Sequence, residues 1–312
     1  MIETLSIYSA VIPVFAVIAV GFVLRQFRFL SEEIDRGLLT LVVHVLVPCL
    51  IIDTMAGNPL VGKLSVLAIA AGVGFVAVAG AILISYVAGR RVGMKQGAGL
   101  RSFALGTGVH NYGYLAIPVV IALYPDSPAL GVLFVHSLGV EVAVWTVGIM
   151  VLTGSRRFAP RTMFSGPVVA VLLGLIFSWT GFDQQMDGPA LVAIGMLGQC
   201  AVPMALLLVG VTVADMMRYT EWSVQVLALG SVLRLMVLPL IYIAAAYFVA
   251  GPYPAIAVVF IVQAAMPSGN FPIVLARHYG GKPEVPIQLV VATTLGSVIS
   301  MPLWLALGKS FL

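Results

Sequence analysis

The sequence predicts an all-α polytopic membrane protein of ten transmembrane helices, arranged as two inverted repeats of five helices each. Three observations predict this fold: an apolar composition, ten apolar segments of membrane-spanning length, and prolines that recur at a fixed interval. Of the 312 residues, 61% are hydrophobic and 9% are charged, whereas about a quarter of the residues in a soluble domain are charged. Because the bilayer core offers no hydrogen-bond partner to the backbone, apolar runs of about 20 residues become helices.

Short polar connections with turn-forming residues separate the ten segments. In chain order the segments lie at residues 8–24, 38–55, 64–88, 102–123, 130–152, 164–180, 189–213, 223–249, 253–276 and 285–307. The first segment has no Lys or Arg ahead of it and no small-residue cleavage site behind it, so we expect a mature helix rather than a signal peptide. We expect Cys49 and Cys200 to be buried thiols, because both lie in apolar segments beside prolines.

Basic residues indicate the orientation, because Lys and Arg near helix ends collect in cytoplasmic loops. With both termini outside the cytoplasm, the inner loops hold thirteen of the sixteen Lys and Arg residues. The net charge of +4 therefore reflects topology, and no nucleic-acid partner is expected. The thirteen are Arg25, Arg28, Arg36, Arg90, Arg91, Lys95, Arg101, Arg156, Arg157, Arg161, Arg218, Arg277 and Lys282.

Prolines within the apolar segments reveal an internal repeat. Pro13 and Pro167 are 154 residues apart, and so are Pro118 and Pro272. Pro48 and Pro203 are 155 residues apart. The predicted units are residues 1–152, a cytoplasmic linker at 153–163, and residues 164–312. Because five helices is an odd number, the second unit must enter the membrane inverted, an arrangement typical of secondary transporters.

The fourth and ninth segments cannot be regular helices throughout. The fourth contains Gly113 and Pro118, and the ninth contains Pro267 and Pro272 at equivalent positions of the repeat. A break exposes backbone groups and half-helix N-termini, which suit an anion such as a carboxylate. Asn111 and Asn270 lie in the two breaks and offer amide groups to such a ligand, although each amide can instead satisfy backbone freed by the break.

These residues carry a resemblance to the auxin efflux carrier family, which includes the plant PIN carriers and bacterial malate and malonate permeases. The most specific stretch is Val262-Gln-Ala-Ala-Met-Pro-Ser-Gly-Asn-Phe-Pro272. Weaker matches are Val11-Ile-Pro13, Leu46-Val-Pro-Cys-Leu50, Asn58-Pro59, Asn111 with Gly113, Ile117-Pro118, Trp145 and Arg234. The sequence departs from the plant members at His110, where they have proline, at Glu141, where they have glutamine, and in its short central linker. Auxin is therefore not implied as the substrate.

The resemblance implies a PIN-like fold, shared with bile-acid symporters, in which broken helices 4 and 9 cross. It implies a scaffold of helices 1, 2, 6 and 7, a mobile transport domain of helices 3–5 and 8–10, and a homodimer joined through the scaffolds. Elevator-like movement is expected by analogy. The predicted substrate-binding residues are Asn111, Tyr112, Gly113, Glu141, Gln263, Ser268, Gly269 and Asn270.

Two charged residues lie near the middle of their apolar segments, about 17 Å from the segment ends at 1.5 Å per residue. Charges at that depth usually face a cavity or a partner, which makes Glu141 and Arg234 candidates for ion coupling or for an ion pair with each other. Asp53 is a weaker candidate for coupling. His44 and His136 are more typical of hydrogen-bonded packing residues.

The predicted function is secondary active transport of small organic anions across the cell membrane, with a carboxylate substrate and membrane lipid as partners. A sodium-coupled symporter similar to the bile-acid transporters is the alternative, with Gln263, Ser268 and Glu141 as oxygen ligands. A channel suits two inverted breaks less well than alternating access does. The sequence has no His-Glu-x-x-His and no Gly-x-Ser-x-Gly motif, so neither an enzyme nor a metal or other cofactor is expected.

Overall fold

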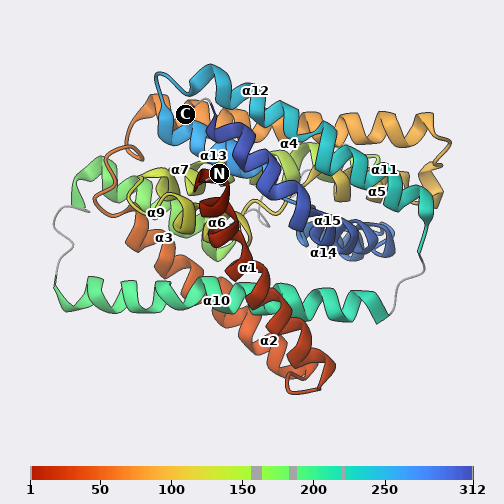
Figure 1. The fold of residues 1–312 in the computed structure, drawn as a ribbon, viewed down its shortest axis with the longest axis horizontal. Helices are drawn as coiled ribbons and strands as arrows, with labels where there is room; N and C mark the ends of the chain where they lie inside the picture. The colour runs from red at the N-terminus through yellow and green to blue at the C-terminus, as the bar shows by residue number, and fades with distance from the viewer. Residues whose placement is uncertain (1, 156–163, 183–187, 219–221, 311) are drawn as a thin grey trace.

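The chain is helical throughout the part that the structure describes, and its helices are joined by short loops (Figure 1). The computed structural model describes residues 2–155, 164–182, 188–218, 222–310 and 312. Most of the predicted linker, residues 156–163, lies outside the described residues, as do Asp183 and Asp187. In the described part, extended pairing is limited to one antiparallel bridge between His110 and Ser268.

Seven helical spans among the described residues are long and apolar enough to cross a membrane. Four are single helices: α1 (Ile2–Gln26), α4 (Leu64–Arg91), α10 (Pro189–Arg218) and α15 (Glu284–Lys309). The other three each contain one wide π-helical turn and comprise α2 (Glu32–Leu41), η1 (Val42–Leu46) and α3 (Val47–Met55); α7 (Ala129–Ala143), η3 (Val144–Gly148) and α8 (Ile149–Thr153); and α11 (Val224–Val232), η6 (Leu233–Val237) and α12 (Pro239–Val249).

The remaining helices are shorter, and four of them belong to the two interrupted segments. The single short helices are α9 (Gly166–Thr180) and the 3-10 turn η2 (Gln96–Ala98). The interrupted segments consist of α5 (Leu100–Gly108) with α6 (Ala116–Leu123), and α13 (Pro254–Ala265) with α14 (Phe271–His278). A half-helix of 8 to 12 residues cannot span a bilayer alone.

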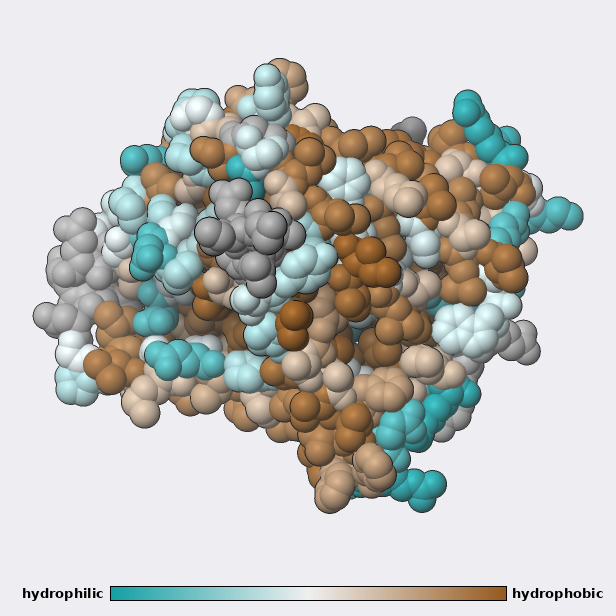
Figure 2. Space-filling model, viewed as in Figure 1, coloured by the Kyte–Doolittle hydropathy of each residue, from teal (hydrophilic) through white to brown (hydrophobic). Residues whose placement is uncertain are grey.

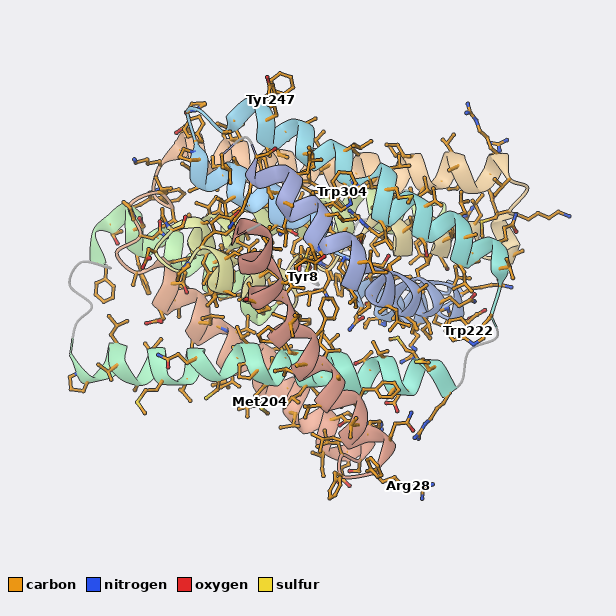
Figure 3. All side chains as sticks on the ribbon, viewed as in Figure 1. Tyr8, Arg28, Met204, Trp222, Tyr247 and Trp304 are labelled. Atoms are coloured by element: carbon orange, nitrogen blue, oxygen red, sulfur yellow. The ribbon has the colours of Figure 1, made fainter. Side chains whose placement is uncertain are left out.

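The outer surface is largely apolar. Brown side chains cover much of the face shown in Figure 2, and teal ones gather toward its edges. Many large apolar side chains are exposed, including Ile12, Val76 and Ile299. Tyr247 points away from the protein at the outer side of α12 (Figure 3). In water such a surface would cause aggregation, whereas lipid solvates apolar side chains. The surface therefore fits a multi-pass membrane protein.

The helices pack in two groups. In one group, α1 lies across α10, and α3 packs against both α9 and α10. In the other, α4 packs against α5 and α7, and α13 packs against α12 and α15. Contacts between the groups are fewer and involve mainly α1 and α10 with α15, α1 with α6, and α7 with α3 and α9.

Glycines allow the crossing of α1 and α10 to be close. A Cβ on Gly21 would collide with the backbone of Leu207, and one on Gly210 would collide with the backbone of Ile18. Small residues at a crossing let membrane helices approach through van der Waals packing, since burial from lipid gives little hydrophobic gain. The same pair is also joined by charge, because the guanidinium of Arg25 binds the Asp215 carboxylate at 2.6 Å through Nε and again through Nη2.

The two cysteines are free thiols, but the expectation that both are buried is wrong. Cys49 is half-buried and Cys200 is exposed. Cys200 lies on α10, where its Sγ approaches the Met196 carbonyl at 3.5 Å. The apolar sequence around Cys200 predicted burial in protein. In a membrane protein, however, an apolar helix face can be exposed to lipid, which also keeps it away from water.

A candidate anion site at two crossing helix breaks

The two interrupted segments meet at their breaks. The backbone N–H of Asn111 donates to the Pro267 carbonyl at 2.8 Å, and the N–H of Gly269 donates to the Val109 carbonyl at 2.9 Å. These two bonds form the antiparallel bridge between His110 and Ser268. Each break therefore satisfies backbone groups that the other break has freed, which is what a non-helical segment needs inside a membrane protein.

Glycine and proline explain why the chain leaves the helix at these positions. Pro118 and Pro272 both lie in the first turn of the helix that follows a break, where a missing N–H costs little. Pro267 lies within the second break. It directly follows Met266, the C-cap residue of α13. A Cβ on Gly269 would lie 2.8 Å from the His110 carbonyl oxygen, so the bridge requires glycine there.

The two asparagines differ in what they already bind. Asn111 is buried, and its side-chain Oδ1 accepts a hydrogen bond from the N–H of Leu115 at 3.2 Å, which helps to start α6. Asn270 is half-buried at the start of α14, and its side chain makes no hydrogen bond with the described residues. The support role considered for both residues is thus seen for Asn111, while the Asn270 amide is free to bind a ligand.

Tyr112 and Gly113 follow Asn111 in the first break. Both are half-buried, and a Cβ built on Gly113 would meet open space. The Tyr112 hydroxyl donates to Oε1 of Glu141 at 2.5 Å, and the indole Nε1 of Trp145 donates to Oε2 at 3.0 Å. Glu141 is therefore held from both oxygens behind Tyr112.

Gln263 and Ser268 lie behind the crossing and are fully buried. The amide Nε2 of Gln263 donates to the Tyr112 carbonyl at 3.2 Å, and the backbone N–H of Ser268 donates to Thr293 Oγ1 at 3.0 Å. Gln263 Oε1 and Ser268 Oγ have no hydrogen-bond partner among the described residues. The predicted set is consequently divided into a half-buried part (Tyr112, Gly113, Glu141 and Asn270) and a buried part (Asn111, Gln263, Ser268 and Gly269).

Arg234 lies in the π-helical turn η6 and is 1% exposed. Its Nε and Nη2 have no partner among the described residues, and neither does the hydroxyl of the neighbouring Tyr242. Taking a charge out of water costs several kcal/mol unless the charge is paired or hydrogen-bonded. The buried guanidinium thus keeps two nitrogens whose N–H groups have no acceptor among the described residues.

The ion pair considered for Glu141 and Arg234 is not formed in the described part of the chain. Glu141 is bound to Tyr112 and Trp145, while Arg234 interacts electrostatically with Tyr242 and with His110. The helices that carry the two residues are not packed on each other, since α7 packs on α4 and α13 whereas η6 packs on α15 and α5, and equal depth in two segments does not make them neighbours. Asp53 is also separate, because its carboxylate lies against Gly195 of α10.

His44 and His136 differ from His110 in what their rings bind. His44 and His136 each place Nδ1 3.0 Å from a backbone carbonyl, of Thr40 and Ala70 respectively. His110 has no partner for either ring nitrogen among the described residues, and its ring lies 5.2 Å from that of Tyr242. The crossing of the two breaks therefore contains a buried imidazole whose two ring nitrogens have no hydrogen-bond partner among the described residues.

Comparison with known proteins agrees with this architecture. A family model described as membrane transport protein matches residues 6–159 and 156–305. The chain belongs to the membrane transport protein family. A transporter of unassigned substrate from Methanothermobacter thermautotrophicus is 26% identical over 300 residues, which cover 95% of this chain and 96% of that protein.

Plant relatives match a shorter region. Auxin efflux carrier component 1 of Arabidopsis thaliana is 30% identical over 136 residues, which cover 43% of this chain and 21% of that protein. Probable auxin efflux carrier component 1c of rice (Oryza sativa subsp. japonica) is also 30% identical, covering 43% of this chain and 22% of the carrier. The resemblance to auxin efflux carriers is confirmed, and this member of a transport family is a transporter rather than an enzyme.

Sequence reasoning missed three residues that shape the site in this membrane transport protein. Thr293 holds the Ser268 backbone, and Tyr242 lies between His110 and His136. Trp304 of α15 donates from Nε1 to the Leu235 carbonyl at 2.8 Å, which supports the π-helical turn that carries Arg234 (Figure 3). Their only sequence signal is a polar or aromatic residue in an apolar segment, which is common and therefore not specific.

Proposed function

We propose that this protein is a secondary active transporter of small organic anions, with a carboxylate bound where the two helix breaks cross. The observation that carries the proposal is a buried cation close to two helix breaks that keep unpaired polar groups. The Asn270 side chain makes no hydrogen bond with the described residues, a Cβ on Gly113 would meet open space, and Arg234 lies buried with unsatisfied N–H donors. Amide donors, half-helix N-termini and a nearby guanidinium all favour a negative ligand group.

The sodium-coupled alternative has weaker support. The unpartnered oxygens of Gln263 and Ser268 are suitable ligands for a cation. Each oxygen of the third expected ligand, Glu141, accepts one hydrogen bond, from Tyr112 or from Trp145, so sodium would have to share this carboxylate with two donors. Arg234 also acts on the His110 side of the bridge and repels cations there. Anion uptake that is unchanged when potassium replaces sodium would exclude the alternative.

The packing of the helices supports the inverted repeat and the ten-helix count. In the proposed repeat, α1 corresponds to α9 and α10 corresponds to α3. The pair α1 and α10 packs closely, and so does the corresponding pair α9 and α3. With the two interrupted segments and α9 added to the seven long spans, the proposed count is ten.

The two packing groups match the proposed scaffold and transport domain. The group of α1, α3, α9 and α10 would form the scaffold, and the group that carries the breaks would form the transport domain. Sparser contacts between the groups suit elevator-like sliding of one against the other. Distances between cysteine pairs across the α1–α15 contact, measured by spin labelling with and without substrate, test this movement.

Orientation and assembly complete the proposal. The C-terminal ends of α4 and α10 and the start of α11 lie at the same end of the molecule (Figure 1). The basic residues Arg90, Arg91 and Arg218 lie there, so we assign that end to the cytoplasm and both termini to the outside of the cell membrane. By resemblance we also propose a homodimer through the scaffold, for which mass photometry in detergent is the test.

A thermal-shift screen of the purified protein tests the proposed substrate class. A ligand that binds only the folded protein stabilises it and so raises the unfolding temperature. At a ligand concentration of a hundred times the dissociation constant, the free energy of unfolding increases by about 2.7 kcal/mol. Small mono- and dicarboxylates should stabilise the protein, while matched primary amides and amines of the same size should not. Stabilisation by the amines and not by the carboxylates would contradict the proposal.

A further inference from the structure

Two adjoining cavities lie at the end of the molecule that we assign to the cytoplasm. Each has a volume of about 370 Å³, and Gln96 and Arg101 line both. They lie between the end of α4, the start of α5 and the loop before α15. This region is distinct from the helix crossing, so a ligand held here is independent of the anion that binds at the crossing.

The two cavities differ in character. The first is lined by apolar side chains that include Leu83 and Met150, which are 51% and 43% exposed on the outer surface. In a membrane those side chains face lipid tails. The second is lined by glycines, Ser102 and Lys282. An apolar hollow open to the lipid therefore continues into a polar, cationic one at Arg101.

Arg101 is fixed in place at the junction. Its Nη1 donates to the Thr153 carbonyl at 3.0 Å, and its Nη2 approaches Gln96 Oε1 at 3.3 Å. Gln96 is in turn held by a 2.8 Å hydrogen bond to the hydroxyl of Tyr86. A guanidinium has five N–H donors, so the fixed group keeps donors for another acceptor.

The positive charge at the junction has no acidic partner in the part of the chain that the structure describes. Neither Arg101 nor Lys282 takes part in an ion pair with the described residues, and no Asp or Glu lines either cavity. Arg90 and Arg91 end α4 nearby and mark the level at which the apolar run meets the membrane surface. Basic pockets between helices at this level suit the head groups of anionic lipids.

We propose that the paired cavities bind one anionic phospholipid, with its phosphate against Arg101 and Lys282 and its glycerol and upper acyl chain along Leu83 and Met150. The amphipathic lining favours a lipid over free phosphate, because a free ion would leave the apolar cavity without a complementary group. Such a lipid would join α4, α5 and the loop before α15, and would stabilise their packing.

The test is thermal unfolding of the full-length protein in mild detergent with added phosphatidylglycerol, phosphatidylcholine or inorganic phosphate. Phosphatidylglycerol should raise the unfolding temperature, and the other two should not. Lys282→Gln and Arg101→Gln should each weaken the apparent affinity for phosphatidylglycerol about fivefold, the effect of removing one basic residue near a lipid surface. The matched control is the double variant Arg90→Gln/Arg91→Gln, which removes two charges that line neither cavity.

The remaining outcomes would each overturn the lipid proposal or leave one variant to test it. Equal stabilisation of all variants, or an equal loss in the control, would mean that lipid acts through general surface charge and would overturn the proposal. Equal stabilisation by inorganic phosphate would replace the lipid with a free anion and overturn it too. If Arg101→Gln does not fold because it loses the bond to Thr153, Lys282→Gln decides alone, since the Lys282 ammonium makes no hydrogen bond with the described residues.

Discussion

The hydroxyl of Tyr112 donates a 2.5 Å hydrogen bond to Oε1 of Glu141, which joins the first helix break to α7. The second oxygen of Glu141 accepts from Trp145, one turn along the same span. The carboxylate thus bridges the break and a neighbouring helix, and it does so without a basic partner among the described residues.

Replacing Glu141 by Gln should destabilise the protein, because both hydrogen bonds lose their charged acceptor: the amide oxygen can accept from Trp145, and the Tyr112 hydroxyl must turn to accept from the amide NH2. Loss of one hydrogen bond to a charged group costs about 1.5–3 kcal/mol. We therefore expect a lower unfolding temperature and an unchanged pH dependence of transport. Tyr112→Phe is the matched control: it removes the same bond from the other side, so the double variant should be little worse than Glu141→Gln alone. An unchanged unfolding temperature with transport that no longer responds to pH would instead make Glu141 the proton carrier.

The two asparagines should separate binding from folding. Asn270→Ala should weaken substrate binding about tenfold to a hundredfold, the loss of one donor to a carboxylate, with the unfolding temperature unchanged. Asn111→Ala should weaken binding and also lower stability by about 1 kcal/mol, because Oδ1 caps the start of α6. Binding by isothermal titration and thermal unfolding measure the two effects. Wild-type affinity in the Asn270 variant would remove it from the site.

Adding a methyl group should distinguish the two break glycines. Gly269→Ala places a Cβ 2.8 Å from the His110 carbonyl oxygen, so the bridge must open and the unfolding temperature should fall. Gly113→Ala meets open space and should unfold at the wild-type temperature. If both variants were equally stable, the close approach of the two breaks would not be required for folding.

Orientation can be tested by accessibility of introduced cysteines, in a background from which Cys49 and Cys200 have been replaced. Lys95→Cys and Asp126→Cys are both exposed and lie at opposite ends of the α4–α6 region. In intact cells we expect an impermeant thiol reagent to label position 126 and to spare position 95. The reverse pattern would place both termini in the cytoplasm.

Local properties of the sequence determined which segments are helical and where two of them break. Apolar windows identify helices because the backbone must bond within its own segment, and proline interrupts that bonding wherever it occurs. Single prolines do not suffice, since Pro13 and Pro203 lie inside continuous helices, whereas the breaks occur where prolines and glycines cluster, around Gly113 and around Pro267. The expectation that an unwound backbone needs partners likewise followed from chemistry alone.

Only the tertiary structure decided which side chains meet. Glu141 and Arg234 have the same depth in their segments, yet Glu141 binds Tyr112 and Trp145, and Arg234 is buried away from it, close enough to Tyr242 for an electrostatic interaction. Such contacts depend on which helices are neighbours and on which face each helix turns toward its neighbour. In an almost uniformly apolar segment, the spacing of apolar residues does not reveal that face. Ser268 illustrates the same limit, since the backbone N–H freed by its break is satisfied by Thr293, a residue that no pattern in the sequence connects to it.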